Sequence, residues 1–403
     1  MNIAIFSDAY IPVKNGVTTS VVQLKEGLEK KGHNVIVITV DVPDYEEKDP
    51  NVYRLPSINT SFGSGTDARL GFLLNYLPII RFLKKKKIDI IHTHTEFTIA
   101  LYGKRVAKKL KLPLVQSTHT MWEEYRHYIL NGKIFTRGMV RKMMSTFMKN
   151  AYCLVCPSIK AEKYYKGLLP TISTVVINNG IDVDKFKSSV ITENEIVSLR
   201  KTFGFKKNEK ILLFVGRIGN EKRVLELFNI VVPILKENNQ IKMIFTGAGP
   251  LTEHISDSAE RLGIEKQVIF TGFVNWDLVY RLYSISDLFI TASLSEVQPM
   301  TLIEASMCGM PMIVRRDDSY LDLVHDGKNG YVVDSDEKMT SKIRSLIYDD
   351  EKLKQFSEYS LKNSSKFTAE NHVVRMEKFY REVLKTYPNK FDGKLFMEKI
   401  MPN

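Results

Sequence analysis

The chain has 403 residues, of which 44% are hydrophobic and 26% are charged, as in ordinary globular proteins. It contains no apolar run of the ~18 residues that a membrane span needs, and its start lacks the basic region of a signal peptide. Three cysteines in a chain of this length argue against a disulfide scaffold and fit a reducing compartment. We therefore expect a cytoplasmic protein of two or three domains.

The net charge of +12 is concentrated in the first half of the chain. Residues 1–190 contain 28 Lys and Arg and 16 Asp and Glu, whereas residues 191–403 contain 30 of each kind. The excess is densest in residues 81–150 and includes Lys84, Lys85, Lys86, Lys87, Lys108, Lys109, Arg137, Arg141 and Lys142. A basic face this local predicts a polyanionic partner, either a nucleic acid or an anionic membrane surface. The sequence has no RNA-binding signature, which favours the membrane.

The first half alternates short apolar strands with helical patterns. We expect helices at residues 17–31 and 101–110, and strands at residues 2–6, 34–40, 88–91, 113–115 and 153–155. This alternation predicts a parallel sheet covered by helices on both faces. In such sheets, ligands bind beyond the carboxyl ends of the strands.

Gly16 and three histidines follow these strands, at the expected ligand-binding edge. Gly16 comes after the first strand, and we expect its backbone to approach a bound diphosphate. His92 and His94 follow the third strand, and His119 follows the fourth. A metal site is disfavoured because no carboxylate completes it, and we interpret one of His92 and His94 as structural.

The stretch from Arg126 to Asn150 mixes basic and apolar residues. In and just before its first part lie four aromatic residues, Trp122, Tyr125, Tyr128 and Phe135. They suit a membrane interface, where amphipathic rings rest near the headgroups. A stripe at helical spacing is formed by Met139, Met143, Phe147 and Ala151. Such a stripe is more often core than lipid contact, so we expect it to be buried.

The alternation restarts in the second half, with strands expected at residues 210–215, 241–246, 268–270, 288–290 and 312–314. The chain is thus predicted to be an α/β protein of two facing, doubly wound, Rossmann-like domains with a cleft between them. The expected domains are residues 1–187, residues 188–370 and a C-terminal helical segment, 371–403, that packs back on the first domain. Asp182 and Asp184 form a D-x-D match, which we interpret as structural because it lies at the domain junction.

The turn after the strand at 210–215 carries two cations suited to a diphosphate. Gly216 lets the backbone approach a ligand closely. Arg217 and Lys222 would then clamp the diphosphate, Arg through paired hydrogen bonds and Lys as a point charge. Gly247 opens a Gly-Ala-Gly-Pro turn after the next strand. This turn is either a plain turn or a loop whose backbone packs near the base or the diphosphate.

Glu296 and Glu304 bracket the start of a predicted helix. Glu296 lies in a strand-to-helix loop and Glu304 about one turn inside the helix, whose first turn accommodates Pro299. Helix N-termini favour phosphate, so the amides of Met300 and Thr301 would donate to the β-phosphate. One carboxylate could then reach a sugar and the other a ribose.

Several of these segments resemble the retaining glycosyltransferases of family 4, which have the GT-B architecture. The most specific are Glu296-x7-Glu304, Phe214-Val-Gly-Arg-Ile-Gly-Asn-Glu-Lys222 and Asn179-Gly-Ile-Asp182, and the resemblance covers about residues 1–385. His92-Thr-His-Thr-Glu-Phe97 and the segment 118–128 look like the bacterial members that put the first sugar on diacylglycerol. Pro299 and Arg223 depart from the pattern, because the family often has Gly at both positions.

The resemblance implies a role for each candidate residue. Arg217 and Lys222 would hold the diphosphate and act in catalysis, and Glu304 would bind the ribose hydroxyls. Glu296 would face the donor sugar, and His119 would bond that sugar near the reacting carbon.

The segment ending at Phe273 resembles one that holds a uracil ring through backbone contacts. The family further implies front-face attack on the sugar, with the leaving phosphate taking the acceptor's proton and with no metal or other cofactor required.

The sequence as a whole predicts a peripheral enzyme on the inner face of the cell membrane. It would move glucose or galactose from a UDP-sugar to diacylglycerol with retention at the anomeric carbon. One alternative is a family 4 enzyme that acts on a soluble, polysaccharide or protein acceptor. A more distant alternative is a nucleic-acid-binding protein that uses the basic first half.

Overall fold

The computed structural model describes residues 1–13, 15–60, 69–72, 76–123, 136–186 and 191–400. The chain forms two compact units, one of residues 1–180 and 369–403 and the other of residues 181–368. The first boundary therefore lies after Gly180, earlier than the expected residue 187, and the C-terminal segment from Ala369 belongs to the first unit. Each unit has its own parallel sheet and its own apolar core.

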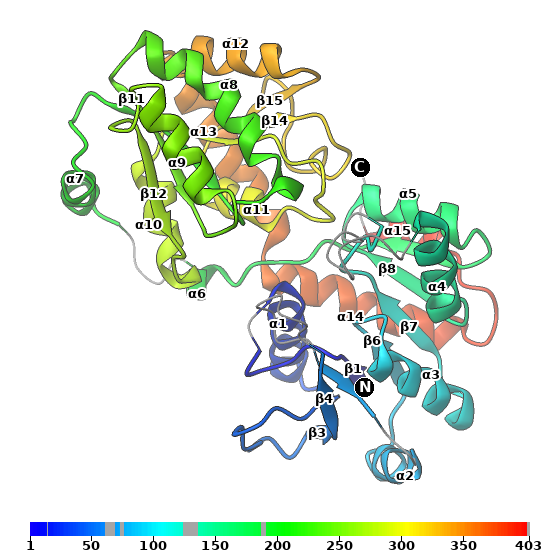
Figure 1. Ribbon diagram of the computed structural model, residues 1–403. Coiled ribbons are helices and arrows are strands. Elements are labelled where there is room, and N and C mark those ends of the chain that lie inside the picture. The colour runs from blue at the N-terminus through cyan, green and yellow to red at the C-terminus, as the bar shows by residue number, and fades with distance from the viewer. Residues whose placement is uncertain (14, 61–68, 73–75, 124–135, 187–190, 401–403) are drawn as a thin grey trace. The chain divides into compact units, whose positions relative to one another are not determined.

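The first unit is built around a parallel sheet (Figure 1). Its strands are β1 (Asn2–Phe6), β2 (Asn34–Val40), β3 (Val52–Leu55), β6 (Ile90–Thr93), β7 (Leu114–Ser117), β8 (Cys153–Cys156) and β9 (Ser173–Val176). Their spatial order is β3-β2-β1-β6-β7-β8-β9, and neighbouring strands run parallel. A separate antiparallel pair consists of β4 (Ser57–Asn59) and β5 (Arg69–Gly71). The strand order reverses between β1 and β6, which makes the carboxyl ends of these two strands a topological switch point.

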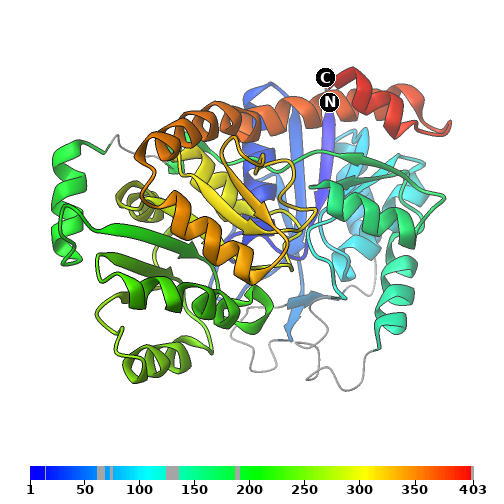
Figure 2. The same cartoon turned by 90° about the horizontal axis from the view of Figure 1, so that it is seen from above.

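Helices cover both faces of this sheet. They are α1 (Gly16–Lys30), α2 (Leu77–Lys85), α3 (Thr98–Leu110), α4 (Arg137–Met148), α5 (Ile159–Leu168), α14 (Ala369–Thr386) and α15 (Gly393–Ile400). The core on one face is formed with α1, α14 and α15, and that on the other with α2 and α3. In Figures 1 and 2, α14 lies beside α1. Gly27 makes room for this contact, because a Cβ there would lie 2.4 Å from Cγ2 of Val373.

The second unit has a parallel sheet of the same kind. Its strands are β10 (Lys210–Val215), β11 (Ile241–Thr246), β12 (Val268–Gly272), β13 (Leu288–Thr291), β14 (Met312–Arg315) and β15 (Gly330–Val333). Their order is β12-β11-β10-β13-β14-β15, all parallel, so the switch point lies between β10 and β13. The α-helices of the unit are α6 (Val183–Phe186), α7 (Glu193–Thr202), α8 (Val224–Glu237), α9 (Thr252–Arg261), α10 (Trp276–Ile285), α11 (Met300–Met307), α12 (Asp336–Leu346) and α13 (Asp350–Ser364). Two 3-10 turns are η3 (Asn220–Lys222) and η4 (Ser365–Phe367).

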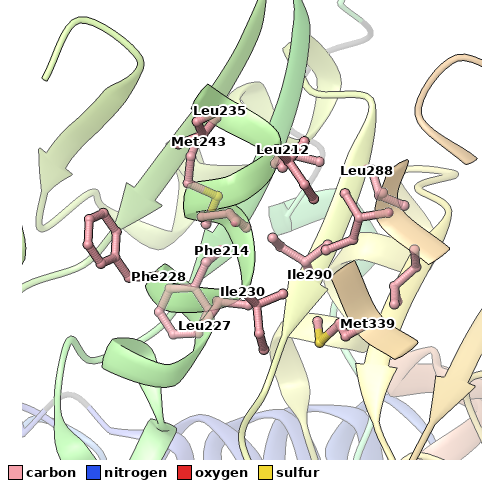
Figure 3. Close-up of a cluster of buried hydrophobic side chains, with 14 of the residues drawn as sticks. Leu212, Phe214, Leu227, Phe228, Ile230, Leu235, Met243, Leu288, Ile290 and Met339 are labelled. Carbon is pink, nitrogen blue, oxygen red and sulfur yellow. The ribbon is translucent and has the colours of Figure 1, made fainter. Parts of the chain in front are cut away.

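Two apolar layers hold the second sheet between its helices. Side chains alternate along β10, so Leu212 and Phe214 point to one face and Ile211 and Leu213 to the other. The first pair packs with side chains of α8 and α12 in the cluster drawn in Figure 3. The second pair packs with side chains of α10 and α11. Fully burying one such side chain contributes about 1.5–3 kcal/mol, so the strands that carry the site residues are held firmly.

The predicted stripe is only partly buried: Ala151, just past α4, is buried, and Met143 and Phe147 are half-buried. The buried residues of this helix are Val140, Met144 and Met148, whereas Met139 is 49% exposed. The helix therefore presents a methionine on its outer face. Within the described ranges, no helix combines the length and the hydropathy needed to cross a bilayer.

Candidate active site

Charged side chains follow both strands at the switch point of the second sheet. The turn after β10 carries Arg217 and leads into η3, where Lys222 lies, and the loop after β13 carries Glu296 and leads into α11. The carboxyl ends of parallel strands meet at one edge of a sheet, so these side chains converge although 74 residues separate Lys222 from Glu296.

Lys222 and Glu296 form an ion pair at this edge. Nζ of Lys222 lies 2.6 Å from Oε1 of Glu296, and each side chain is 18% exposed. The hydroxyl of Ser293 also donates to Oε1 of Glu296, at 3.0 Å. The hydroxyl of Ser295 donates to the backbone carbonyl of Glu221 at 2.8 Å and so ties the Lys222 turn to the Glu296 loop. The two charged groups are therefore positioned by their own loops.

Arg217 is held near the same turn. Its Nε lies 3.7 Å from Oε1 of Glu221, whose side chain is almost fully buried. The Arg217 side chain is about half exposed. A buried carboxylate thus orients a guanidinium that still reaches solvent, an arrangement suited to paired hydrogen bonds with a phosphate.

The glycines after β10 and β11 let two loops meet backbone to backbone. Gly247 has a φ of 127°, and a Cβ on it would lie 2.0 Å from the carbonyl oxygen of Gly216. A Cβ on Gly249 would lie 2.2 Å from the carbonyl oxygen of Ile218. Close packing of the loops therefore explains Gly247 and Gly249 by itself, and a contact between the Gly247 backbone and a ligand stays a prediction.

Glu304 lies inside α11, as predicted, and is buried. Its Oε1 accepts a hydrogen bond from Nε1 of Trp276 and its Oε2 accepts one from the hydroxyl of Tyr283, both at 2.8 Å. Burial raises the pKa of Glu304 to about 7, and the two hydrogen bonds partly oppose this shift. Sequence reasoning missed Trp276 and Tyr283, which both come from α10. Each carboxylate oxygen still has a second lone pair for a further donor.

The start of α11 offers backbone donors. The helix begins at Met300, and its N-cap residue, Pro299, makes no side-chain cap. The amides of Leu302 and Ile303 donate to the carbonyl of Pro299, at 3.1 and 3.3 Å. The amides of Met300 and Thr301 come before this first helical hydrogen bond, so no carbonyl of the helix is placed to accept from them. Phe273, just after β12, is 79% exposed.

Among the candidate residues of the first unit, Gly16 follows β1 and His94 and His119 follow β6 and β7. His92 lies inside β6 rather than after it, because that strand extends to Thr93. Gly16 is the first residue of α1, and a Cβ on it would meet no atom within 4 Å. His119 follows β7 and is half-buried. Its Nε2 lies 3.1 Å from Nδ1 of His94, and Nε2 of His94 lies 3.1 Å from Nδ1 of His92. The three predicted histidines therefore form one chain of side chains.

Across the described part of the chain, no three His, Cys, Asp or Glu side chains are arranged to hold a metal ion. Asp182 and Asp184 lie at the start of α6. Cys153 and Cys156 are buried and unbridged in β8.

Comparisons with known proteins agree with this arrangement. The family description "Glycosyl transferases group 1" matches residues 196–363, and "Glycosyltransferase Family 4" matches residues 14–185. The alpha-monoglucosyldiacylglycerol synthase of Acholeplasma laidlawii is 31% identical over 402 residues, which cover 98% of this chain and 100% of the relative. The chain belongs to glycosyltransferase family 4.

Two further comparisons extend this assignment. The alpha-monoglucosyldiacylglycerol synthase of Streptococcus pneumoniae is 30% identical over 388 residues, which cover 95% of this chain and 86% of the relative. The crystal structure of HepE from Anabaena in complex with UDP matches with a TM-score of 0.73 at 17% identity, covering 94% of this chain and 100% of that one. This structural likeness shows that the family 4 chain has the expected GT-B fold.

The glycosyltransferase also has two acidic residues after β1 and β6, the half-buried Asp8 and the buried Glu96, that sequence reasoning missed. The carboxylate of Asp8, after β1, accepts from the hydroxyls of Thr95 (2.5 Å) and Thr98 (2.9 Å). Glu96 is 3% exposed and accepts from Nε1 of Trp122 at 3.1 Å. Burial raises the pKa of Glu96 to about 8, with the Trp122 hydrogen bond opposing the shift. The available signal was positional, because both acids directly follow neighbouring strands.

The basic residues predicted to face a membrane are mostly exposed. The exposed ones are Lys84, Lys85, Lys87, Lys108, Lys109, Arg137, Arg141 and Lys142. Lys86 instead donates to Oδ1 of Asn51 at 2.9 Å and is half-buried. Trp122 is also half-buried and packs its ring edge against Phe97. Tyr125, Tyr128 and Phe135 lie outside the described residues.

Proposed function

We propose that this glycosyltransferase moves a hexose, glucose or galactose, from a UDP-sugar to the free hydroxyl of diacylglycerol, with retention at the anomeric carbon. The observation that carries the proposal is the match to two synthases of monoglucosyldiacylglycerol, which extends over almost the whole chain at 30–31% identity. Because the match includes both units, it covers the residues proposed for the donor and those proposed for the acceptor side.

The donor diphosphate would be bound by the cations after β10. A phosphate oxygen replaces Glu296 as the partner of Lys222, and the guanidinium of Arg217 donates to the same diphosphate. Fixed positive groups that face a leaving group are usually the largest single contribution to such a reaction. Breaking the ion pair also turns the Glu296 carboxylate toward a new donor, and the hydroxyls of the transferred sugar supply one.

The remaining donor contacts would come from backbone groups and from Glu304. The amides of Met300 and Thr301 would donate to the β-phosphate, at the positive end of α11. The ribose hydroxyls would donate to Glu304, and the uracil ring would lie against the backbone before Phe273. HepE of Anabaena, which shares the fold, was crystallised with UDP, which supports a uridine nucleotide over other donors.

The chemical step would need no covalent intermediate. The bond from the anomeric carbon to the β-phosphate oxygen breaks, and its electron pair stays on UDP. The hydroxyl oxygen of diacylglycerol attacks from the same face, and its proton passes to the leaving phosphate oxygen. Retention follows from this geometry, and cationic side chains would stabilise the diphosphate without a bound metal.

The acceptor would be reached from the cytoplasmic membrane surface. The exposed lysines of the α2 region and the cations of α3 and α4 would attract anionic headgroups, each with about 1 kcal/mol near the surface. Leu77 on α2 and Met139 on α4 are 44% and 49% exposed, and each lies on the same helix as exposed basic residues. Apolar groups beside cations suit shallow insertion at the headgroup boundary.

A donor screen with diacylglycerol in anionic liposomes tests the proposal. UDP-glucose, UDP-galactose and GDP-mannose are each supplied with and without EDTA, and the lipid fraction is analysed by mass spectrometry. We expect a monohexosyl diacylglycerol from a UDP-hexose in both conditions. If the hexose is transferred only to soluble acceptors, the acceptor is a soluble molecule and the proposal of a lipid acceptor is wrong. Activity that is lost in EDTA and restored by Mg²⁺ would contradict the metal-independent step.

A further inference from the structure

A continuous chain of hydrogen-bonding side chains runs from α14 to His119 within the first unit. The hydroxyl of Tyr380 lies 2.6 Å from Nδ1 of His92, and Nε2 of His92 lies 2.8 Å from the hydroxyl of Ser117. His94 uses both of its ring nitrogens, one toward His92 and one toward His119, each at 3.1 Å. Among these contacts of the described residues, His94 is therefore the link between His92 and His119.

The three histidine rings of this hydrogen-bonded series are uncharged at neutral pH. His92 and His94 are buried, and burial lowers the pKa of both well below the usual histidine value. Burial also lowers the pKa of His119 to about 4. A neutral imidazole carries one N–H and one bare nitrogen, so it can donate on one side only. Each histidine ring must therefore accept a hydrogen bond at one nitrogen if it donates one from the other.

Only two directions of donation satisfy this rule. In the first, His119 donates from Nε2 to His94, and His94 donates from Nε2 to His92. In the second, every one of these bonds is reversed, so His94 donates from Nδ1 to His119. The two directions leave opposite groups on the far side of His119: a bare Nδ1 in the first, and an Nδ1–H in the second.

Tyr380 decides between the two directions. Its side chain is fully buried in the core between α14 and the sheet, so its hydroxyl proton needs an acceptor. In the first direction Nδ1 of His92 is bare, and its one lone pair is shared by the Tyr380 hydroxyl at 2.6 Å and Nε2–H of His94 at 3.1 Å. In the second direction Nδ1 of His92 carries its own hydrogen, and the phenol loses its acceptor. The first direction also lets Nε2–H of His92 donate to Ser117.

We propose that His94 is a positioning residue that, together with Tyr380, holds His119 in the Nε2–H form, so that its bare Nδ1 accepts a hydroxyl of the donor sugar. The contact with the sugar rests on the proposed function, whereas the state of the ring does not. The inference also gives His92 and His94 distinct roles: His92 receives the hydroxyl of Tyr380, and His94 transmits the direction to His119. A hydroxyl on a C-terminal helix thereby sets the hydrogen-bonding character of a residue after β7.

Nitrogen-15 NMR of histidine-labelled protein without added ligand tests this inference. Bare and protonated imidazole nitrogens resonate far apart, and the signals of His119 are assigned by their loss in His119→Phe. We expect a protonated Nε2 and a bare Nδ1 on His119. A protonated Nδ1 and a bare Nε2 would overturn the proposal. Because no substrate is present, this result is independent of whether diacylglycerol is the acceptor.

Tyr380→Phe is the decisive variant, because it removes one hydroxyl and leaves the packed ring in place. We expect the His119 nitrogens to shift toward a mixture of both forms, although Tyr380 does not touch His119. Tyr359→Phe is the matched control, since its hydroxyl lies 2.7 Å from Nδ1 of His325 in the other unit. An unchanged His119 signal in Tyr380→Phe would contradict the proposed role of Tyr380.

Turnover provides a second reading. We expect His94→Leu to lower kcat roughly 10- to 100-fold, as for other residues that orient a functional imidazole. His94→Gln should recover most of this loss, because an amide can accept from His119 and donate to His92. Tyr380→Phe should lower kcat roughly 2- to 10-fold, the equivalent of one hydrogen bond. Equal kcat in His94→Leu and wild type would show that His94 does not act on the reaction.

Discussion

Lys222 is the residue on which the proposed donor site depends most directly. In the structure its ammonium group is paired with Glu296 and lies in a turn held by the hydroxyl of Ser295. Lys222 would lose little side-chain entropy when a phosphate replaces Glu296 as its partner, because the two loops already fix both side chains. In the proposed reaction the same exchange frees Oε1 of Glu296 from Lys222, so that this oxygen can accept from a hydroxyl of the sugar.

Removing either clamp cation should therefore lower the rate strongly. We expect Arg217→Ala and Lys222→Ala to reduce kcat/KM by about 10²–10³, as for other preorganised charge donors. Arg223→Gln is the matched control, because Arg223 lies next to Lys222 but pairs with Glu226 at 3.2 Å. Steady-state kinetics with folded variants provide the measurement, and near-normal turnover in Arg217→Ala would refute the clamp.

The two carboxylates should differ in what their loss affects. Glu304→Ala should weaken UDP binding, because a ribose contact is lost, whereas Glu296→Ala should mainly lower turnover, because its partner is the reacting sugar. Calorimetric titration with UDP separates these effects. If both variants lose the same affinity for UDP, the assignment of the two roles is wrong.

The raised pKa of Glu304 also predicts a pH dependence of stability. Its pKa is about 7 in the folded protein and 4.5 in a free side chain. The folded state thus holds the proton more tightly, so this contribution to stability is fully present below pH 4.5 and is lost as the pH rises through 7. Relative to wild type, Glu304→Gln should gain on the order of 2–3 kcal/mol in free energy of unfolding between pH 5 and pH 8. Denaturant titrations at both pH values measure this, and parallel pH profiles would contradict the shift.

The sequence predicted the charged residues of the site better than their surroundings. The placement of Glu296 in a loop and of Glu304 one turn inside a helix is correct, because an apolar strand, a proline and a helical pattern follow one another along the chain. The partners of Glu304 were not predictable, because Trp276 and Tyr283 come from another helix and their sequence pattern indicates only a buried face. Asp8 and Glu96 were missed although both follow neighbouring strands, because their partners Thr98 and Trp122 come from other segments of the chain.

At the scale of elements, the central strands were predicted and several edge strands were not. β1, β2, β10 and β11 have the predicted bounds, because a strand buried on both faces reads as a continuous apolar run. β3, β9 and β15 lie at the edges of the two sheets and were not predicted. An edge strand such as β3 is only partly buried, so its sequence, Val-Tyr-Arg-Leu, lacks that run.

The error on α4 concerns two stripes that both contain methionine. Met139 and Met143 keep helical spacing with Phe147, but so do Val140 and Met144 with Met148. Periodicity alone could not decide which stripe is buried, because both are apolar. The structure buries the second stripe and leaves Met139 on the outside, between exposed basic residues.

The α2 region should be an electrostatic contact with the membrane. We expect Lys84, Lys85, Lys86 and Lys87→Gln to weaken binding to anionic vesicles and to leave UDP binding unchanged, because the donor residues Arg217, Lys222 and Glu304 belong to the other unit. Binding of the wild type should fall as salt rises, since salt screens exposed charges within about 8–10 Å. Vesicle co-sedimentation across a series of lipid compositions and salt concentrations provides the measurement.

A control of equal charge separates location from net charge. The exposed lysines Lys338, Lys354, Lys362 and Lys366 lie in the second unit, and their replacement by Gln removes the same four charges. We expect that variant to bind vesicles nearly as well as the wild type. Equal losses in the two variants would indicate that only the net charge of +12 matters. Equal binding of the wild type to neutral and anionic vesicles would argue against the electrostatic contact.

At the scale of the whole molecule, the chain leaves the first unit at Gly180 and returns to it at Ala369. The sequence analysis expects the C-terminal helical segment to pack back on the first domain, but its apolar face does not say which helix it contacts there. The close fit of Val373 against Gly27 shows why α14 packs on α1. This return also brings Tyr380 to the histidines, so the C-terminal helix takes part in the proposed site of the first unit.

The central claim is transfer of a hexose from a UDP-sugar to diacylglycerol with retention, and the structure of the lipid product tests it most directly. The protein is incubated with diacylglycerol liposomes and UDP-glucose or UDP-galactose labelled with carbon-13 in the sugar, and the purified lipid is examined by NMR. The account predicts one labelled hexose on the free hydroxyl of diacylglycerol, with the α configuration of the donor. A β-linked product, or label found only in water-soluble products, would contradict it.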